Sequence, residues 1–201
     1  MRQILPFHIG LNFDALGALS IVMTTVRHLN TAELEAALPE VAASPAEVGR
    51  LEMIVRRPAT DERELLPEAE LSVEAGLVGD NWSRGRAQPE CQLTLMNSRA
   101  AQMVAQSRER WALAGDQLYV DLNLGGENLP AGSRIEIGDE AVVEVTAEPH
   151  TGCSKFVARF GADAMKFVNA PAGRALNLRG INTRVVRGGA IRVGDVVRKV
   201  G

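Results

Sequence analysis

The stretch INTRVVRGGAIRVGDVVRKV, residues 181–200, contains three short runs rich in valine and isoleucine, separated by a Gly-Gly pair and a Gly-Asp pair. Branched side chains favour extended backbone, and these turn pairs tolerate the positive φ that tight turns require. The stretch therefore predicts a meander of three strands. The predicted strands cover residues 181–186, 190–193 and 196–200.

The same pattern occurs upstream, where RIEIGDEAVVEVTA at residues 134–147 places a Gly-Asp pair between two apolar runs and predicts a hairpin. Many short strands with glycine turns favour a barrel or a sandwich, so the predicted fold class is mainly β with peripheral helices. Residues 51–55 and 92–96 are further predicted strands, residues 32–38, 99–111 and 154–160 are predicted helices, and the acidic segment 61–70 is a predicted solvated loop.

The β-rich part is predicted to form one domain over residues 49–200, preceded by an N-terminal extension and linker over residues 1–48. Thr31 is the predicted cap of the short helix in this extension, and residues 39–49 are the predicted linker. Residues 1–22 lean apolar, but proline, histidine, asparagine and aspartate interrupt the run, which does not indicate a signal peptide. We expect these residues to be loosely attached and dispensable.

Charge and cysteine content exclude several classes of function. The formal net charge is −3, and the basic residues form no long block, so no nucleic-acid partner is expected. The sequence has no run of about 18 apolar residues, so no membrane partner is expected. Two cysteines without a C-x-x-C pair are too few for a disulfide framework or a zinc site, and they favour a reducing, cytoplasmic setting.

Cys153 is the residue that is predicted to carry chemistry. Pro149 and Gly152 end the preceding strand, and Ser154 is the predicted cap of a short helix through Phe160, which places Cys153 at the helix N-terminus. The unpaired N–H groups of a helix start, with positive charge from Lys155, Arg159 and a protonated His150, would lower the pKa of the thiol and make it a nucleophile or a metal ligand. The alternative, that Cys153 only packs as a small apolar residue, carries equal weight on these residues alone. Cys91 is predicted to pack.

Three glycine-rich or arginine-rich segments are further candidates. Gly126 and Asn128 lie in a loop whose backbone could approach a ligand closely. Arg84 and Arg86 follow a glycine-punctuated loop, and Arg179 precedes another glycine turn, so each could bind a phosphate or a carboxylate. Ordinary solvated loops would have the same sequences, and that alternative stays open.

Four motifs in one order resemble the MOSC domain family. They are GLVGD at 76–80, GENL at 126–129, GCSKF at 152–156, and RG at 179–180 followed by GAIRVGD at 189–195. The family module occurs at the C-terminus of molybdenum cofactor sulfurases and in stand-alone bacterial proteins. The resemblance implies a mostly antiparallel β-barrel with helices outside it, over about residues 49–200. It also implies a pocket around the family cysteine, which matches Cys153, with Asn128 near it.

The resemblance implies a role for Cys153 in carrying sulfur or in binding molybdenum. In the first interpretation the protein is a sulfur carrier or is associated with the molybdenum cofactor, molybdopterin, and Cys153 accepts sulfur with help from Lys155 or Arg159. In the second it is an oxidoreductase in which Cys153 is the metal ligand and arginines hold the pterin phosphate. In the third it is a binding module for a small anion, without chemistry.

The partners follow from these interpretations. They are a small-molecule or cofactor ligand, and a sulfur-donor protein or a molybdoenzyme, because the chain is too short to hold a pyridoxal-phosphate sulfurase module as well. Cys153, Asn128 and at least one of four arginines are predicted to meet in one cavity. The four arginines are Arg84, Arg86, Arg159 and Arg179.

Overall fold

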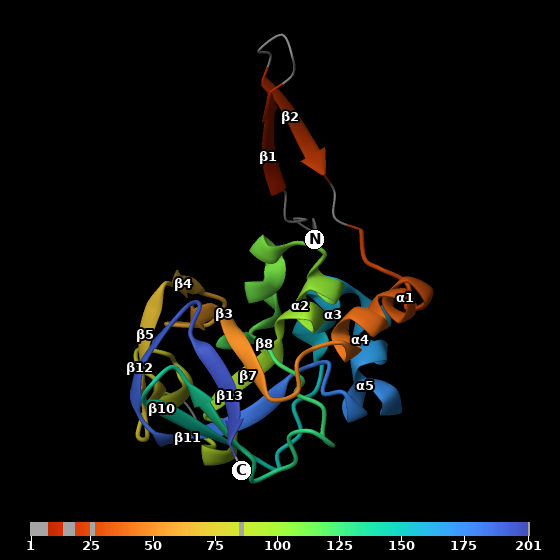
Figure 1. Cartoon of the computed structure of the whole chain (residues 1–201). Coiled ribbons are helices and arrows are strands. Elements are labelled where there is room, and N and C mark those ends of the chain that lie inside the picture. Colours follow the sequence, from red (N-terminus) through yellow and green to blue (C-terminus); the bar gives the residue numbers. More distant parts are fainter. Residues whose placement is uncertain (1–7, 14–18, 25–26, 85–86, 201) are drawn as a thin grey trace.

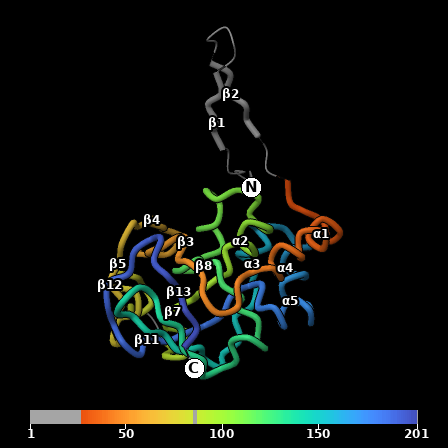
Figure 2. The backbone as a smooth tube through the Cα atoms, viewed as in Figure 1, coloured from red at the N-terminus to blue at the C-terminus, as the bar shows by residue number. Residues whose placement is uncertain are grey.

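The computed structural model describes residues 8–13, 19–24, 27–84 and 87–200 of the 201-residue chain. Figure 1 shows the elements along the chain, and the tube in Figure 2 follows the backbone in the same view. Within the described ranges, no helix has the length and apolar character that crossing a membrane requires.

Seven strands form a closed barrel in the order β13-β9-β10-β11-β7-β8-β3, and pairing of β13 with β3 closes it. The pairs are antiparallel except β7 with β8, which is parallel. The predicted antiparallel barrel with peripheral helices is therefore confirmed. The strands are β3 (Val48–Arg56), β7 (Leu93–Asn97), β8 (Leu118–Asp121), β9 (Arg134–Ile137), β10 (Ala141–Val145), β11 (Ile181–Arg187) and β13 (Val196–Val200).

A smaller sheet and a hairpin strand lie beside the barrel. Strand β4 (Glu64–Leu66) pairs with the end of β3, and β12 (Gly189–Arg192), β5 (Glu68–Ser72) and β6 (Gly76–Leu77) form a three-stranded sheet. The prediction of a solvated loop over residues 61–70 is therefore wrong. The segment is acidic because most of its side chains are exposed, while Leu71, the residue that follows it, is buried in the barrel core. The predicted meander over residues 181–200 is wrong as well, because β11, β12 and β13 each pair with strands from elsewhere in the chain and not with one another.

The N-terminal strands β1 (His8–Phe13) and β2 (Leu19–Thr24) pair with each other in a separate two-stranded sheet. The remainder of the segment 1–26 lies outside the described residues. The expectation that residues 1–22 are dispensable stays a prediction.

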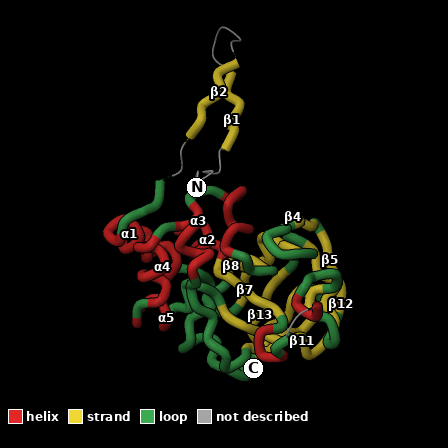
Figure 3. The backbone as a smooth tube through the Cα atoms, turned by 180° about the vertical axis from the view of Figure 1, so that it is seen from behind, coloured by secondary structure: helices red, strands yellow, loops and turns green. Residues whose placement is uncertain are grey.

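Five α-helices group on one side of the barrel, as the view in Figure 3 shows. Together with the outer faces of β3, β7 and β8 they enclose a second apolar core, whereas the first core fills the barrel. The helices are α1 (Thr31–Ala42), α2 (Ser98–Ala105), α3 (Ser154–Phe160), α4 (Ala162–Asn169) and α5 (Pro171–Ala175), with short 3₁₀ helices at Trp82–Arg84, Pro89–Cys91 and Arg108–Ala114.

Helix α1 differs from its prediction at both ends. Asn30, not Thr31, is the cap, because its side chain accepts from the Glu33 N–H while the Glu33 carboxylate accepts from the Asn30 N–H. The helix continues through Pro39, so the predicted linker is four residues shorter at its start. Leu34 of α1 is fully buried in the second core. The domain boundary at residue 49 stays a prediction, although α1 packs on the domain.

The predicted helix over 99–111 is interrupted. Gln106 adopts a left-handed φ of 66° and ends α2, and the chain then continues as the 3₁₀ helix Arg108–Ala114. The carbonyl groups of Leu113 and Ala114, at the end of this 3₁₀ helix, accept hydrogen bonds from Arg159 and Arg179.

Candidate functional site

The loop that carries Cys153 is held by an asparagine on a neighbouring helix. Asn169 of α4 accepts from the Gly152 N–H at 2.9 Å and donates to the Gly152 carbonyl at 3.2 Å. Helix α3 covers Ser154–Phe160 and ends at Gly161, so its position agrees with the prediction, but Ser154 is its first residue and not its cap. Cys153 itself, with extended backbone, is the N-cap residue. The side chain of Cys153 is exposed.

Two aromatic residues fix the orientation of α3. Phe156 and Phe160 lie on its inner face, are almost fully buried in the second core and have ring centroids 4.8 Å apart. Because these rings anchor the inner face, the cysteine at the helix start and the basic residues on the outer face are directed away from the core.

Cys153 lies in the wall of a cavity of about 390 Å³, called here the thiol cavity. Lys155 and Arg159, both predicted from the sequence as site residues, line the same cavity. Two further basic side chains, Arg57 and Arg63, line it from the segment between β3 and β4, and the sequence analysis did not identify them.

Arg57 is held rigidly by Asp80, the aspartate of the GLVGD motif. The Asp80 side chain is fully buried and accepts from Arg57 Nε at 3.0 Å and Nη2 at 2.8 Å, and from the Arg57 backbone N–H at 2.8 Å. Arg57 Nη1 also donates to the Gly115 carbonyl at 2.8 Å. The motif therefore positions a guanidinium in the wall of the thiol cavity.

Asp61 lines the same cavity and is paired with both basic side chains of α3. Its Oδ1 accepts from Lys155 Nζ at 3.1 Å and from Arg159 Nη2 at 3.0 Å, and the hydrogen bond from Lys155 lowers the pKa of Asp61. Arg159 also donates through Nη1 to the Leu113 carbonyl at 2.8 Å. Burial, together with the charge of Arg159, lowers the pKa of Arg63.

The surroundings of Cys153 favour its thiolate. Partial burial acts to raise the pKa of the thiol, but the backbone N–H groups of Phe156 and Lys155 and the charges of Arg179 and Arg159 outweigh it, so the pKa of Cys153 is lowered. The N–H groups act at the helix start without a side-chain capping hydrogen bond. For Cys91, burial and two nearby glutamates raise the pKa of the thiol.

Arg179 lies beneath the site. It is 7% exposed, donates to Asp116 Oδ2 at 2.6 Å and to the Ala114 carbonyl at 2.8 Å, and its Cζ lies 5.3 Å from the Phe156 ring centroid. Together with Gly126 it lines a second cavity of about 480 Å³, which is distinct in its lining from the thiol cavity.

His150 also lines the second cavity, and its Nδ1 lies 3.4 Å from Asp116 Oδ1. Burial lowers the pKa of His150 to about 4, so the imidazole is neutral near pH 7 and does not supply the positive charge predicted for it beside Cys153. The Asp116 carboxylate is already paired with Arg179, so it compensates only part of the cost of charging the imidazole. The loop 149–153 thus lines the second cavity near its start and the thiol cavity at its end.

Asn128, predicted to lie beside Cys153, does not line the thiol cavity. Asn128 donates through Nδ2 to the carbonyl groups of Ala46 and Asn123, both at 2.8 Å, and accepts from Lys199 Nζ at 3.3 Å. Its amide therefore braces its own loop, and the predicted meeting of Asn128 with Cys153 in one cavity is wrong. Of the residues in that prediction, Cys153 and Arg159 line the same cavity.

Arg84, in the glycine-punctuated loop, does not line the thiol cavity. Arg84 is exposed and donates to the Pro58 carbonyl at 3.1 Å, while Arg86 lies outside the described residues. The described part of the chain holds no group of three or more His, Cys, Asp or Glu side chains placed for a metal ion.

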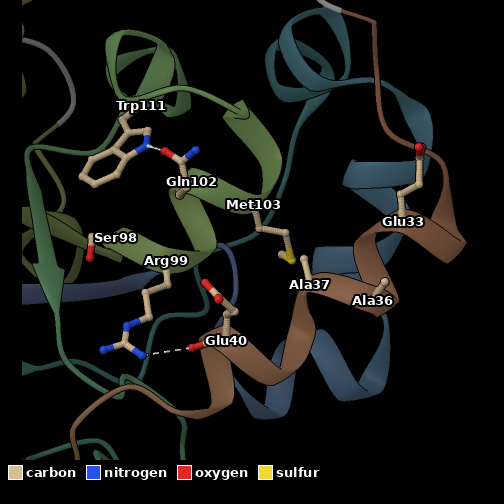
Figure 4. A pocket seen from close by; sticks show the side chains of 9 residues that line it. All are labelled: Glu33, Ala36, Ala37, Glu40, Ser98, Arg99, Gln102, Met103 and Trp111. Atoms are coloured by element: carbon tan, nitrogen blue, oxygen red, sulfur yellow. Dashed lines mark hydrogen bonds between the residues drawn. The ribbon is translucent and has the colours of Figure 1, made fainter.

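A third cavity, of about 640 Å³, lies between α1 and α2 and shares no lining residue with the thiol cavity (Figure 4). Met103 and Ala37 face each other across it, Trp111 donates to Gln102 Oε1 at 2.9 Å, and Arg99 donates to the Glu40 carbonyl. None of the residues that line it is a cysteine or a histidine.

Comparison with solved structures supports the fold. YuaD from Bacillus subtilis is 16% identical with a TM-score of 0.52, and the match covers 75% of this chain and 94% of that one. YiiM from Escherichia coli is 20% identical (TM-score 0.51; 76% and 70% covered), and YiiM from Geobacillus stearothermophilus is 14% identical (TM-score 0.50; 76% and 73% covered). Likeness at these identities shows the fold alone.

Sequence comparison gives the family. A search among curated proteins finds no significant match. The model of the MOSC domain matches residues 83–198, which is more than half of the chain and includes Cys153, Lys155 and Arg159. The chain therefore belongs to the MOSC domain family.

Proposed function

We propose that this protein is a sulfur carrier that serves molybdenum-cofactor chemistry, with Cys153 as the sulfur acceptor. The observation that carries the proposal is the exposed Cys153 thiol, whose pKa is lowered, in the wall of a basic cavity within a MOSC domain. Exposure matters because the sulfur would come from another protein, whose own persulfide must reach Cys153.

The transfer step needs a thiolate. The Cys153 thiolate attacks the terminal sulfur of a donor persulfide, R–S–SH, and a new S–S bond forms on Cys153 while the donor S–S bond breaks. The donor leaves as R–S⁻, and the carrier holds Cys153–S–SH, so the charge moves from acceptor to donor and no oxidant is required. Arg159 and Lys155 would stabilise the negative charge near Cys153 before and after the transfer.

The residues of the thiol cavity fit a phosphorylated molybdenum cofactor in their chemistry. A thiolate is a soft ligand suited to such a metal, and Lys155 and Arg159 are suited to a phosphate group. When bound, the cofactor would supply the metal centre that receives the sulfur. The second interpretation, a cofactor-holding oxidoreductase with Cys153 as metal ligand, uses the same residues, so an experiment must separate the two.

The test of the carrier is sulfur loading followed by intact mass measurement. Protein incubated with a persulfide-charged sulfurtransferase should gain one sulfur atom, Cys153→Ser should gain none, and the matched variant Cys91→Ser should gain one. An unchanged mass of the native protein would contradict the carrier and favour the anion-binding module. Stoichiometric molybdenum in protein purified from a host that makes the cofactor would favour the oxidoreductase.

Reactivity of the two thiols provides a second test. An alkylating probe should modify Cys153 well before Cys91, because the pKa of Cys153 is lowered and the pKa of Cys91 is raised. Lys155→Ala and Arg159→Ala should slow the reaction of Cys153. Equal rates for the two cysteines at every pH would mean that the site does not activate the thiol.

A further inference from the structure

We propose that Asp61 is a built-in counter-ion, and that the phosphate-type oxyanion of a ligand displaces it from Lys155 and Arg159 beside Cys153. The inference rests on the proposed function and deepens it, because it names the class of ligand that the site takes and the group that must yield to it.

The geometry places Asp61 where such an anion would bind. A single carboxylate oxygen, Oδ1, lies 3.1 Å from Lys155 Nζ and 3.0 Å from Arg159 Nη2. Both cations belong to α3, within two turns of Cys153, whereas Asp61 comes from the loop between β3 and β4. The carboxylate therefore occupies the position in which an oxyanion would accept hydrogen bonds from both cations.

An incoming anion could replace Asp61 in its ion pairs with Lys155 and Arg159. The side chains of Asp61 and Lys155 are 59% and 56% exposed, and ion pairs at such positions are weak and screened by salt. Arg159 is more rigid, because its side chain is 19% exposed and its Nη1 is fixed on the Leu113 carbonyl. An anion entering the cavity therefore meets one pre-positioned donor and has to displace only an exposed carboxylate.

The charges of the cavity favour an added anion. Arg57 is neutralised by the buried Asp80, which leaves three basic side chains facing Asp61 and Glu62. The repulsion between the arginines is visible in the lowered pKa of Arg63, to which the charge of Arg159 contributes after burial. A phosphate group carries more negative charge than the Asp61 carboxylate, so the exchange would reduce this repulsion.

The size of the cavity is compatible with an oxyanion carried on an organic group as well as with a free one. Its volume of about 390 Å³ falls within the range of small-molecule sites. Experiments must therefore include both sources of the same chemistry, for which inorganic phosphate and phenyl phosphate are suitable probes.

The test compares dissociation constants of these two probes, measured by titration calorimetry on the full chain carrying Cys153→Ser. Because the variant has no thiol at position 153, anion binding is measured separately from sulfur loading. A negative result in one experiment therefore leaves the result of the other interpretable. Asp61→Asn should tighten binding about fivefold, because the displaced charge is gone. Lys155→Ala should weaken binding by a similar factor.

The matched control is Glu62→Gln, which removes the same charge one residue away in the same cavity. No ion pair of Glu62 is found among the described side chains, so this variant should change binding less than twofold. Equal tightening by both variants would mean that general charge, and not displacement of Asp61, controls binding, and it would overturn the proposal. Unchanged affinity in Asp61→Asn would overturn it too.

The relative affinity of the two probes then identifies the source of the oxyanion, since tighter binding of phenyl phosphate points to an organic ligand.

A second measurement, on protein with native Cys153, does not depend on calorimetry. The rate of Cys153 alkylation by anionic iodoacetate, relative to neutral iodoacetamide, should rise in Asp61→Asn and stay constant in Glu62→Gln. A constant ratio in both variants would contradict the displacement.

Discussion

Replacing Asp80 by asparagine tests how the basic wall of the thiol cavity is held. The Asp80 carboxylate is buried and accepts five hydrogen bonds. Three come from Arg57, and the others come from the Trp82 N–H at 3.2 Å and from Gln117 Nε2 at 3.4 Å. Asparagine retains one carbonyl oxygen, while its amide N–H₂ would face the guanidinium donors without an acceptor.

The loss in the free energy of unfolding that Asp80→Asn should cause can be estimated from the burial of Asp80 and Arg57. Breaking a buried ion pair by removing one partner costs about 3–5 kcal/mol. The Arg57 side chain is 24% exposed and can recover part of its hydration, so the lower end, about 3 kcal/mol, applies. For a chain of this size that loss lowers the melting temperature by roughly 6–12 °C.

The assay is thermal and urea unfolding of Asp80→Asn beside Asp139→Asn, an exposed aspartate in the turn between β9 and β10. The control should stay within about 0.5 kcal/mol of the native protein. A loss below about 1 kcal/mol in Asp80→Asn would refute the reasoning, because Arg57 would then not depend on the buried carboxylate.

Two further properties are predicted. The free energy of unfolding should have its full value above pH 6.5 and should fall as the pH drops towards about 4. Burial lowers the pKa of His150 in the folded protein, so the unfolded chain binds a proton on this histidine at a higher pH than the folded chain does. The loss amounts to roughly 3 kcal/mol, and His150→Gln should flatten that part of the pH curve; an unchanged curve would exclude His150 as its cause. Removal of residues 1–22 should barely shift the melting temperature, whereas Leu34→Ala in α1 should cost about 2–5 kcal/mol because Leu34 is fully buried. A large shift on truncation would show that the removed residues contribute core contacts.

The strands of the barrel were predictable wherever glycine turns separate branched residues. The predicted boundaries of β9 and β13 agree with the structure because each strand is bounded by such a turn or loop. Strands β4 and β5 were missed because they lie in an acidic segment with exposed polar faces, and few of their side chains reach the core. The partner of β5 is β12, more than a hundred residues later in the chain, and local sequence does not reveal such a pairing.

The site was predictable only as far as it is local. Cys153, Lys155 and Arg159 lie within two turns of one helix, so their neighbourhood follows from the sequence. Asp61 comes to them from almost a hundred residues away, through the path of the chain after β3. Asn128 was wrongly predicted to lie beside Cys153. Its amide could have bound a ligand, but it donates instead to backbone carbonyl groups that hold its own loop.

Closure of the barrel has a consequence for how the protein folds. The β13–β3 pairing joins Val196 to Arg50, about 150 positions apart along the chain. Bringing such distant segments together costs chain entropy before any contact compensates for it, so barrels of this kind fold slowly. Until that pairing forms, β3 and β13 each present an unpaired edge, and these two strands are where an incompletely folded chain would associate with another copy.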